Sequence, residues 1–129
     1  MATSQVILFV LVALVAALYL RRWVLLRGMK QYSPREVAEA MKQSGSKVLL
    51  DVRTAGERQR NSIKGSIHIP LHDLGRRVGE LNKHRNKEVI CYCQSGNRSI
   101  SAAARLKKSG FTVANMKGGI GEWNSSGLQ

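Results

Sequence analysis

The first part of the chain is a long apolar run, and the remainder alternates short apolar and polar stretches. Residues 2–20 carry no charge, and residues 6–20 are almost wholly Val, Leu, Ile, Phe and Ala. A membrane span usually takes about 20 apolar residues. Arg21 and Arg22 can snorkel to the membrane surface, so that residues 23–26 lengthen the span. The pattern predicts one transmembrane helix that contacts the lipid bilayer through residues 2–26.

A cleaved signal peptide is the alternative interpretation of this segment. Signal peptides place basic residues before the apolar core and small residues after it. Here residues 1–5 lack Lys and Arg, whereas Arg21, Arg22, Arg27 and Lys30 follow the core. We therefore expect residues 1–27 to be a retained anchor with a basic flank. The positive-inside rule then places the N-terminus outside and the following domain in the cytoplasm, in a single-pass arrangement.

Residues 33–129 have the pattern of a small α/β domain, which follows a short basic linker at residues 28–32. Short apolar runs have the length of buried strands, and the amphipathic or capped segments between them favour helices. The expected strands are residues 48–52, 66–69, 88–92 and 111–114, and the expected helices are residues 34–44, 54–60, 74–81 and 99–109, with a last short helix around Trp123. Strands that alternate with helices predict a mainly parallel central sheet flanked by helices.

The expected strand at residues 88–92 leads directly to Cys93, and a polar loop and a helix from Ser99 follow. In parallel sheets, functional loops lie at the carboxyl ends of the strands. Free backbone N–H groups and the dipole at a helix N-terminus favour an anion. We therefore expect Cys93 to have a lowered pKa and a substantial thiolate fraction. Arg98 adds a positive charge, with four residues between it and Cys93.

The composition limits the other classes of function. The chain has 21 Lys and Arg against 8 Asp and Glu, a net charge of +13. Nucleic-acid binding is not expected, because the sequence has no helix-turn-helix or zinc-finger spacing and only 5% aromatic residues. Attraction to an anionic membrane surface or to small anionic substrates fits the charge, and a merely solvated basic surface is the remaining alternative. The histidines have no metal-ligand spacing with the cysteines, so neither a metal nor a cofactor is expected.

Four sequence motifs occur in order along the domain. They are Leu50-Asp51-Val52-Arg53 followed by Glu57, residues 63–71 (IKGSIHIPL), residues 92–99 (YCQSGNRS), and Gly118-Gly119-Ile120 followed by Trp123. Together they resemble the rhodanese-like superfamily, over residues 32–127. The N-terminal span makes the chain similar to a membrane-anchored bacterial variant of the single-domain sulfurtransferases in that superfamily. The location that this resemblance implies is a bacterial inner membrane.

The resemblance implies the transfer of sulfane sulfur through a persulfide on Cys93, from a donor such as thiosulfate to a thiophilic acceptor. Arg98 would be the second catalytic residue. The loop would form a cup around the substrate sulfur with Gln94, Ser95, Gly96, Asn97 and Ser99. These residues do not choose between a small sulfur-donor anion and a protein persulfide as the donor. Related cysteine-dependent phosphatases have five residues between Cys and Arg, so the four residues here favour a tighter ring that suits a sulfur atom.

Further predictions concern the surroundings of this loop. Asp51 is expected to support the loops under Cys93 by pairing with backbone N–H groups or with Arg53. Arg53 and Glu57 are expected to form an ion pair across their turn. Cys91 is expected to be a small buried strand residue rather than a second reactive thiol. A structural disulfide between the two cysteines is not expected in a domain that faces the cytosol.

A different class of function is also open. The domain would then be a membrane-docked binding module, or adaptor, for a membrane-protein partner, with little catalytic role. Adaptors among rhodanese-like domains often lack the cysteine. This chain has both Cys93 and Arg98, which favours the enzyme.

Overall fold

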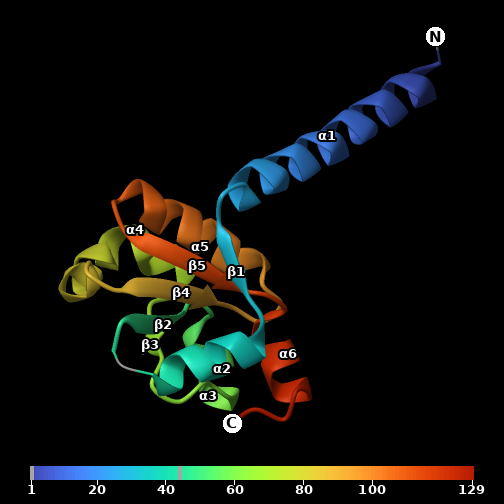
Figure 1. Ribbon diagram of the computed structural model, residues 1–129. Helices are drawn as coiled ribbons and strands as arrows, with labels where there is room; N and C mark the ends of the chain where they lie inside the picture. Colours follow the sequence, from blue (N-terminus) through green and yellow to red (C-terminus); the bar gives the residue numbers. More distant parts are fainter. Residues whose placement is uncertain (1, 44) are drawn as a thin grey trace.

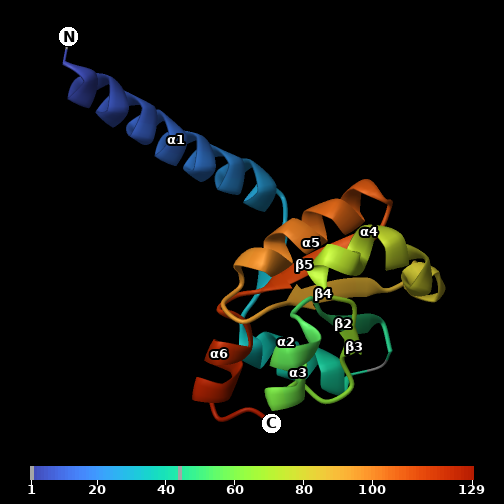
Figure 2. The ribbon, with the colours of Figure 1, turned by 180° about the vertical axis from the view of Figure 1, so that it is seen from behind.

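A computed structural model describes residues 2–43 and 45–129. Helix α1 (Thr3–Leu26) extends away from the α/β domain that follows it (Figures 1 and 2). Its 24 residues correspond to about 36 Å of helix, more than the ~30 Å hydrocarbon core of a bilayer. None of its side chains is buried. Within the described residues, it is the one helix long and apolar enough to cross a membrane.

Five strands form a single sheet in the order β1-β5-β4-β2-β3. The strands are β1 (Lys30–Tyr32), β2 (Lys47–Asp51), β3 (Ile67–His68), β4 (Glu88–Tyr92) and β5 (Thr112–Met116). Every neighbouring pair is parallel, so the carboxyl ends of all strands meet at one edge of the sheet. The predicted α/β fold with a parallel central sheet is confirmed.

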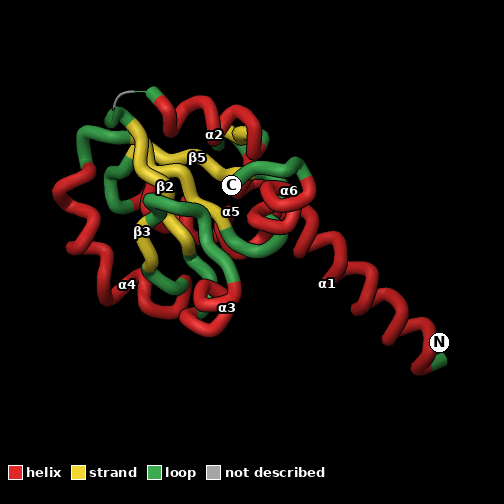
Figure 3. The backbone as a smooth tube through the Cα atoms, turned by 90° about the horizontal axis from the view of Figure 1, so that it is seen from below, coloured by secondary structure: helices red, strands yellow, loops and turns green. Residues whose placement is uncertain are grey.

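Helices cover both faces of this sheet (Figure 3). They are α2 (Pro34–Lys42), α3 (Ala55–Arg60), α4 (Leu74–Arg77), α5 (Asn97–Lys108) and α6 (Gly119–Ser125). Side chains alternate between the two faces along each strand. In β4, Val89 and Cys91 pack in the core beneath α4 and α5, whereas Ile90 and Tyr92 pack in the core beneath α2 and α6. Cys93 belongs to the same core as Cys91.

Part of the segment predicted as a linker, residues 28–32, is a strand of the sheet. Residues 30–32 form β1, which pairs with β5 at the edge of the sheet, where Gln31 lies opposite Asn115. The strand is short and begins with two polar residues, so it lacks the apolar run that identifies a buried strand. The Tyr32 hydroxyl donates to Glu88 Oε1 at 2.7 Å, which ties this edge strand to β4.

Two helix predictions also change in their details. The expected helix at residues 74–81 is a single α-helical turn, α4, that continues as a 3₁₀ helix at Val78–His84. Gly75 and Gly79 interrupt the segment, and glycine is a poor helix former. Helix α5 begins at Asn97, two residues before the predicted start at Ser99. The predicted end of the first domain helix, residue 44, lies outside the described residues.

Candidate active site

Cys93 lies one residue beyond the carboxyl end of β4, at the N-terminus of the 12-residue helix α5. Its side chain is almost fully buried, with 1% of the residue exposed. The backbone N–H of Gly96 donates to Cys93 Sγ at 3.1 Å. The Ser99 hydroxyl lies 3.4 Å from the same sulfur. The loop therefore directs hydrogen-bond donors at the thiol rather than away from it.

These donors decide the protonation of the thiol. Burial by itself would raise the pKa of Cys93. Hydrogen bonds from the Ser99 hydroxyl and from the backbone N–H groups of Ser99, Gly96 and Ser95 outweigh burial and bring the pKa below its ordinary value. The sequence argument from the helix N-terminus predicted this direction.

The loop has its shape because of glycines at two places. Gly96 has a φ of +99°, and a Cβ there would lie 3.2 Å from the backbone nitrogen of Gly118. Gly119 has a φ of +60°, and a Cβ there would lie 2.3 Å from the carbonyl oxygen of Cys93. The segment before α6 thus packs directly on the loop, and the N–H of Ile120 donates to the Cys93 carbonyl oxygen at 2.9 Å. The motif at residues 118–120 marked this segment in the sequence, but its contact with Cys93 is visible only in the structure.

Arg98 is fixed by Glu57, which lies at the start of α3. Its two terminal nitrogens donate to the two carboxylate oxygens at 2.7 Å each. These bonds from Arg98 lower the pKa of Glu57 to about 2, against a partial opposing effect of burial. Sequence reasoning did not find this pair, because the two residues are 41 positions apart.

The predicted ion pair between Arg53 and Glu57 is therefore wrong. Arg53 contacts Glu57 only through the backbone carbonyl oxygen, at 3.4 Å. Its guanidinium binds both carboxylate oxygens of Asp51 instead, at 3.1 and 3.0 Å. The capping box turns the Glu57 side chain back toward Thr54, on the side where Arg98 reaches it.

Asp51 is the centre of a buried polar cluster beneath the loop. Its carboxylate accepts hydrogen bonds from Arg53, from the Tyr92 hydroxyl at 2.9 Å and from Arg58 at 3.1 Å. Burial would raise the pKa of Asp51, but these bonds, chiefly those from Arg53, lower it. Because Tyr92 directly precedes Cys93, the cluster holds the end of β4 in place. The predicted pairing of Asp51 with Arg53 is present.

The other residues of the predicted cup lie on the loop surface or at its base. Gln94, Ser95 and Asn97 are exposed, whereas Gly96 and Ser99 are buried. The Asn97 side chain accepts a hydrogen bond from Arg22 of α1, so the apolar helix contacts the loop directly.

Cys91 is a free and fully buried strand residue, as predicted. Burial raises the pKa of its thiol to about 12.

Comparisons with known proteins place the α/β domain in a known family. The sequence profile of the rhodanese-like domain matches residues 33–126. The thiosulfate sulfurtransferase GlpE of Pseudomonas savastanoi pv. phaseolicola is 36% identical over 94 residues, which cover 72% of this chain and 86% of that protein. The Bacillus subtilis protein YrkF is 42% identical over 76 residues, which cover 58% of this chain and 40% of that protein.

A solved structure shows the same fold. The rhodanese-related protein of Thermoplasma volcanium superposes with a TM-score of 0.71 at 30% identity, over 78% of this chain and 95% of that one. The profile covers more than half of this chain, and the similarity to GlpE extends over most of both proteins. The chain therefore belongs to the rhodanese-like family, with an apolar helix before the family domain.

Proposed function

We propose that the chain is a membrane-anchored sulfurtransferase that carries sulfane sulfur as a persulfide on Cys93. The observation that carries the proposal is the set of donors around the Cys93 sulfur, which stabilises a thiolate inside the loop. The similarity to GlpE, a thiosulfate sulfurtransferase, supports thiosulfate as the donor. A protein persulfide is the alternative donor.

The proposed reaction has two displacement steps. The Cys93 thiolate attacks the outer sulfur of thiosulfate, the sulfur–sulfur bond of the donor breaks, and sulfite leaves with the electron pair. The acceptor thiolate then attacks the terminal sulfur of the persulfide and returns Cys93 to the thiolate. Gly96, Ser95 and Ser99 supply the hydrogen bonds that stabilise the anionic sulfur at each stage.

Arg98 has the role of a charge beside the reacting sulfur. Its bidentate pair with Glu57 uses two of the five N–H donors of the guanidinium. The remaining donors are available for the oxygens of an anionic sulfur donor. Glu57 is then a positioning residue, because it acts on the substrate only through Arg98.

The membrane part of the proposal rests on α1. We propose that this helix spans a bacterial inner membrane, with the N-terminus outside and the domain in the cytoplasm. The apolar helix and the basic residues Arg21, Arg22 and Arg27 at its end support this arrangement. The contact between Arg22 and Asn97 supports a retained helix rather than a cleaved signal, because cleavage would remove it.

Membrane topology has a direct test. In spheroplasts, protease added outside should leave the domain intact, whereas protease added to inverted membrane vesicles should digest it. Digestion from outside would contradict the proposed orientation. A shortened protein in the soluble fraction would show instead that the helix is a cleaved signal.

The sulfur-transfer proposal is tested by intact mass of the full chain in detergent after incubation with thiosulfate. We expect a gain of one sulfur atom that cyanide removes. Cys93→Ser should abolish the gain, and Cys91→Ser is the matched control that should retain it. If neither thiosulfate nor a protein persulfide adds sulfur to the wild type, the enzyme proposal fails and the adaptor interpretation takes its place.

A further inference from the structure

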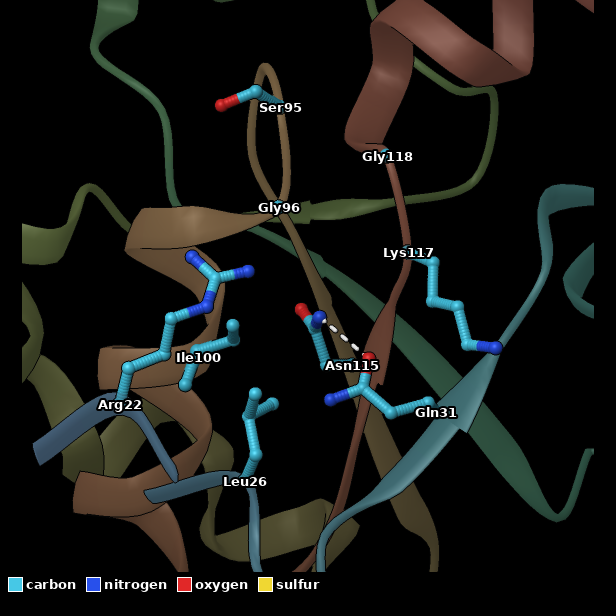
Figure 4. Close-up of a pocket in the computed structure, with 9 residues that line it drawn as sticks. All are labelled: Arg22, Leu26, Gln31, Ser95, Gly96, Ile100, Asn115, Lys117 and Gly118. Carbon is cyan, nitrogen blue, oxygen red and sulfur yellow. Dashed lines mark hydrogen bonds between the residues drawn. The ribbon is translucent and has the colours of Figure 1, made fainter. Parts of the chain in front are cut away.

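A cavity of about 380 Å³ lies between the end of α1 and the active-site loop (Figure 4). Helix α1, the edge strand β1, its neighbour β5 with the residues that follow it, the loop itself and the first turn of α5 all contribute to its walls. The lining residues are Arg22, Leu26, Gln31, Ser95, Gly96, Ile100, Asn115, Lys117 and Gly118. The proposed sulfur chemistry uses two of these residues, Ser95 and Gly96, and both only through their backbone N–H groups.

Two amide side chains in the wall have polar atoms that no protein group satisfies. Asn115 is 2% exposed, and its Nδ2 donates to Gln31 Oε1 at 2.9 Å. Among the residues that the structure describes, Asn115 Oδ1 and Gln31 Nε2 are buried and have no hydrogen-bond partner. Turning both amides over would still leave one donor and one acceptor without a partner. Folded proteins rarely leave such groups unsatisfied, so they indicate a ligand.

Figure 4 shows that both atoms lie on the side that faces Arg22, Leu26 and Ile100. The cavity therefore offers a hydrogen-bond acceptor, a hydrogen-bond donor and a guanidinium group in one space, beside two apolar side chains. No acidic side chain is among its described lining residues. Glu122 lies close to Gly118 but belongs to α6 and does not line the cavity.

We propose that this cavity binds a small molecule that carries an anionic group and, a few atoms away, an N–H donor. The anion binds Arg22, its second oxygen accepts from Gln31 Nε2, and the N–H group donates to Asn115 Oδ1. Cavities of this size hold small organic molecules. Free amino acids and short peptides have this chemistry, and so does the headgroup of an aminophospholipid.

Both sources are compatible with where the cavity lies. Arg22 and Leu26 belong to the end of α1, where the helix leaves the proposed membrane, so a headgroup has access to the site. A dissolved amino acid or peptide reaches it from the aqueous side. Both kinds of ligand present the same anionic group and N–H donor to the cavity.

The site also touches the reaction loop. Gly96 forms part of the wall, and its N–H donates to Cys93 Sγ. An occupant in contact with Gly96 therefore touches one of the residues whose backbone N–H groups lower the pKa of the thiol. The inference goes beyond sulfur transfer, because binding is measured without any sulfur donor and stands or fails independently of the persulfide.

The test uses the ¹⁵N-labelled full chain in detergent micelles and follows the side-chain amide signals of Asn115 and Gln31. The probes are phosphoethanolamine and glycylglycine, which carry both groups, and inorganic phosphate and ethanolamine, which carry one each. We expect the two-group probes to shift both signals and to bind at least about tenfold more tightly than the one-group probes. If no probe shifts either signal, the proposal is overturned.

Spectra in nanodiscs, recorded first with no added solute, distinguish a lipid headgroup from a dissolved ligand as the occupant of the cavity. Signals that differ between phosphatidylcholine discs and discs that also contain phosphatidylethanolamine support the site and identify a lipid headgroup. Signals that are the same in both discs, but respond to glycylglycine, support the site and identify a dissolved ligand.

Variants connect binding to the named residues. Arg22→Gln should weaken binding about tenfold, whereas its neighbour Arg21→Gln, which lies outside the cavity lining, should not. Gln31→Leu should also weaken binding and lies on an edge strand, where the substitution disturbs the core less than one at Asn115. Wild-type affinity in both Arg22→Gln and Gln31→Leu would overturn the proposal, whatever the result of the sulfur-transfer assay.

Discussion

Two thiols two residues apart, in the same core and both almost fully buried, have pKa values shifted in opposite directions. Cys91 is surrounded by apolar core, and burial raises its pKa to about 12. Cys93 lies one residue past the strand, where Ser99 and the loop N–H groups lower its pKa despite burial. The difference shows that the pKa of a buried thiol here depends on hydrogen-bond donors at the end of the strand and not on exposure. Hydrogen-bond donors where a strand end meets a helix N-terminus favour the thiolate form of a buried cysteine.

The largest effect expected from this comparison is in alkylation of the two thiols. At pH 7 the thiolate fractions differ by at least about a thousandfold, from the pKa of about 12 at Cys91 and the lowered pKa at Cys93. Iodoacetamide should therefore label Cys93 in the Cys91→Ser variant and leave Cys91 unlabelled in the Cys93→Ser variant. Peptide mass spectrometry measures both, and similar labelling rates would refute the assignment.

A substitution that displaces the loop should reduce the difference in pKa between Cys91 and Cys93. Gly119→Ala places a Cβ against the Cys93 carbonyl oxygen, so we expect a loss of about 3 kcal/mol or more in the free energy of unfolding, together with slow Cys93 alkylation. Gly127→Ala is the control. Its φ of +73° is also left-handed but nothing lies within 4 Å, so it should cost only about 1 to 2 kcal/mol. Equal costs in urea denaturation would show that the loop adjusts without strain.

A smaller effect is expected from Ser99→Ala, which removes the side-chain donor that lowers the pKa of Cys93 most. The alkylation rate at pH 7 should fall roughly 3- to 10-fold, and the pH profile should move upward. Ser95→Ala leaves its backbone N–H in place and serves as the control, with a rate near that of the wild type. An unchanged profile in Ser99→Ala would assign the shift to the backbone alone.

The smallest effect concerns Glu57 and its pair with Arg98. Because the pKa of Glu57 in the folded chain is about 2 and its ordinary value is 4.5, the pair stabilises the fold above about pH 5 and loses that effect as the pH falls toward 2. Glu57→Gln should cost about 1 kcal/mol at pH 7, since the pair is partly exposed. The difference from the wild type should disappear in acid. Glu39→Gln, in an exposed pair with Lys42, is the control and should cost little stability at pH 7.

Local patterns in the sequence were sufficient to predict the central strands of the parallel sheet and the position of Cys93 at the end of one of them. Strands β2 and β4 have apolar runs, and Cys93 follows the second of them directly, so position along the chain reveals position in the fold. Strand β1 was missed because an edge strand of three residues with polar Lys30 and Gln31 has no such run.

Local sequence patterns also could not predict ion pairs between residues that are far apart in the sequence. A spacing of four residues suggested that Arg53 binds Glu57, but Asp51 offers Arg53 a buried bidentate partner two residues away. Glu57 then pairs with Arg98, which only the parallel arrangement of β2 and β4 brings near it. Competition among several charges in one turn is decided by the fold, and the sequence spacing does not reveal it.

The short connection between α1 and β1 has a consequence for how the protein meets its substrates. Residues 27–29 separate the two elements and span at most about 10 Å, less than the ~13 Å radius of gyration of a 100-residue domain. In the membrane-anchored protein that we propose, so short a tether holds the Cys93 loop at a set height and angle above the lipid. Partners within the same membrane then encounter it by lateral diffusion in two dimensions, at a high effective concentration. A soluble carrier must instead approach the narrow space beside the bilayer.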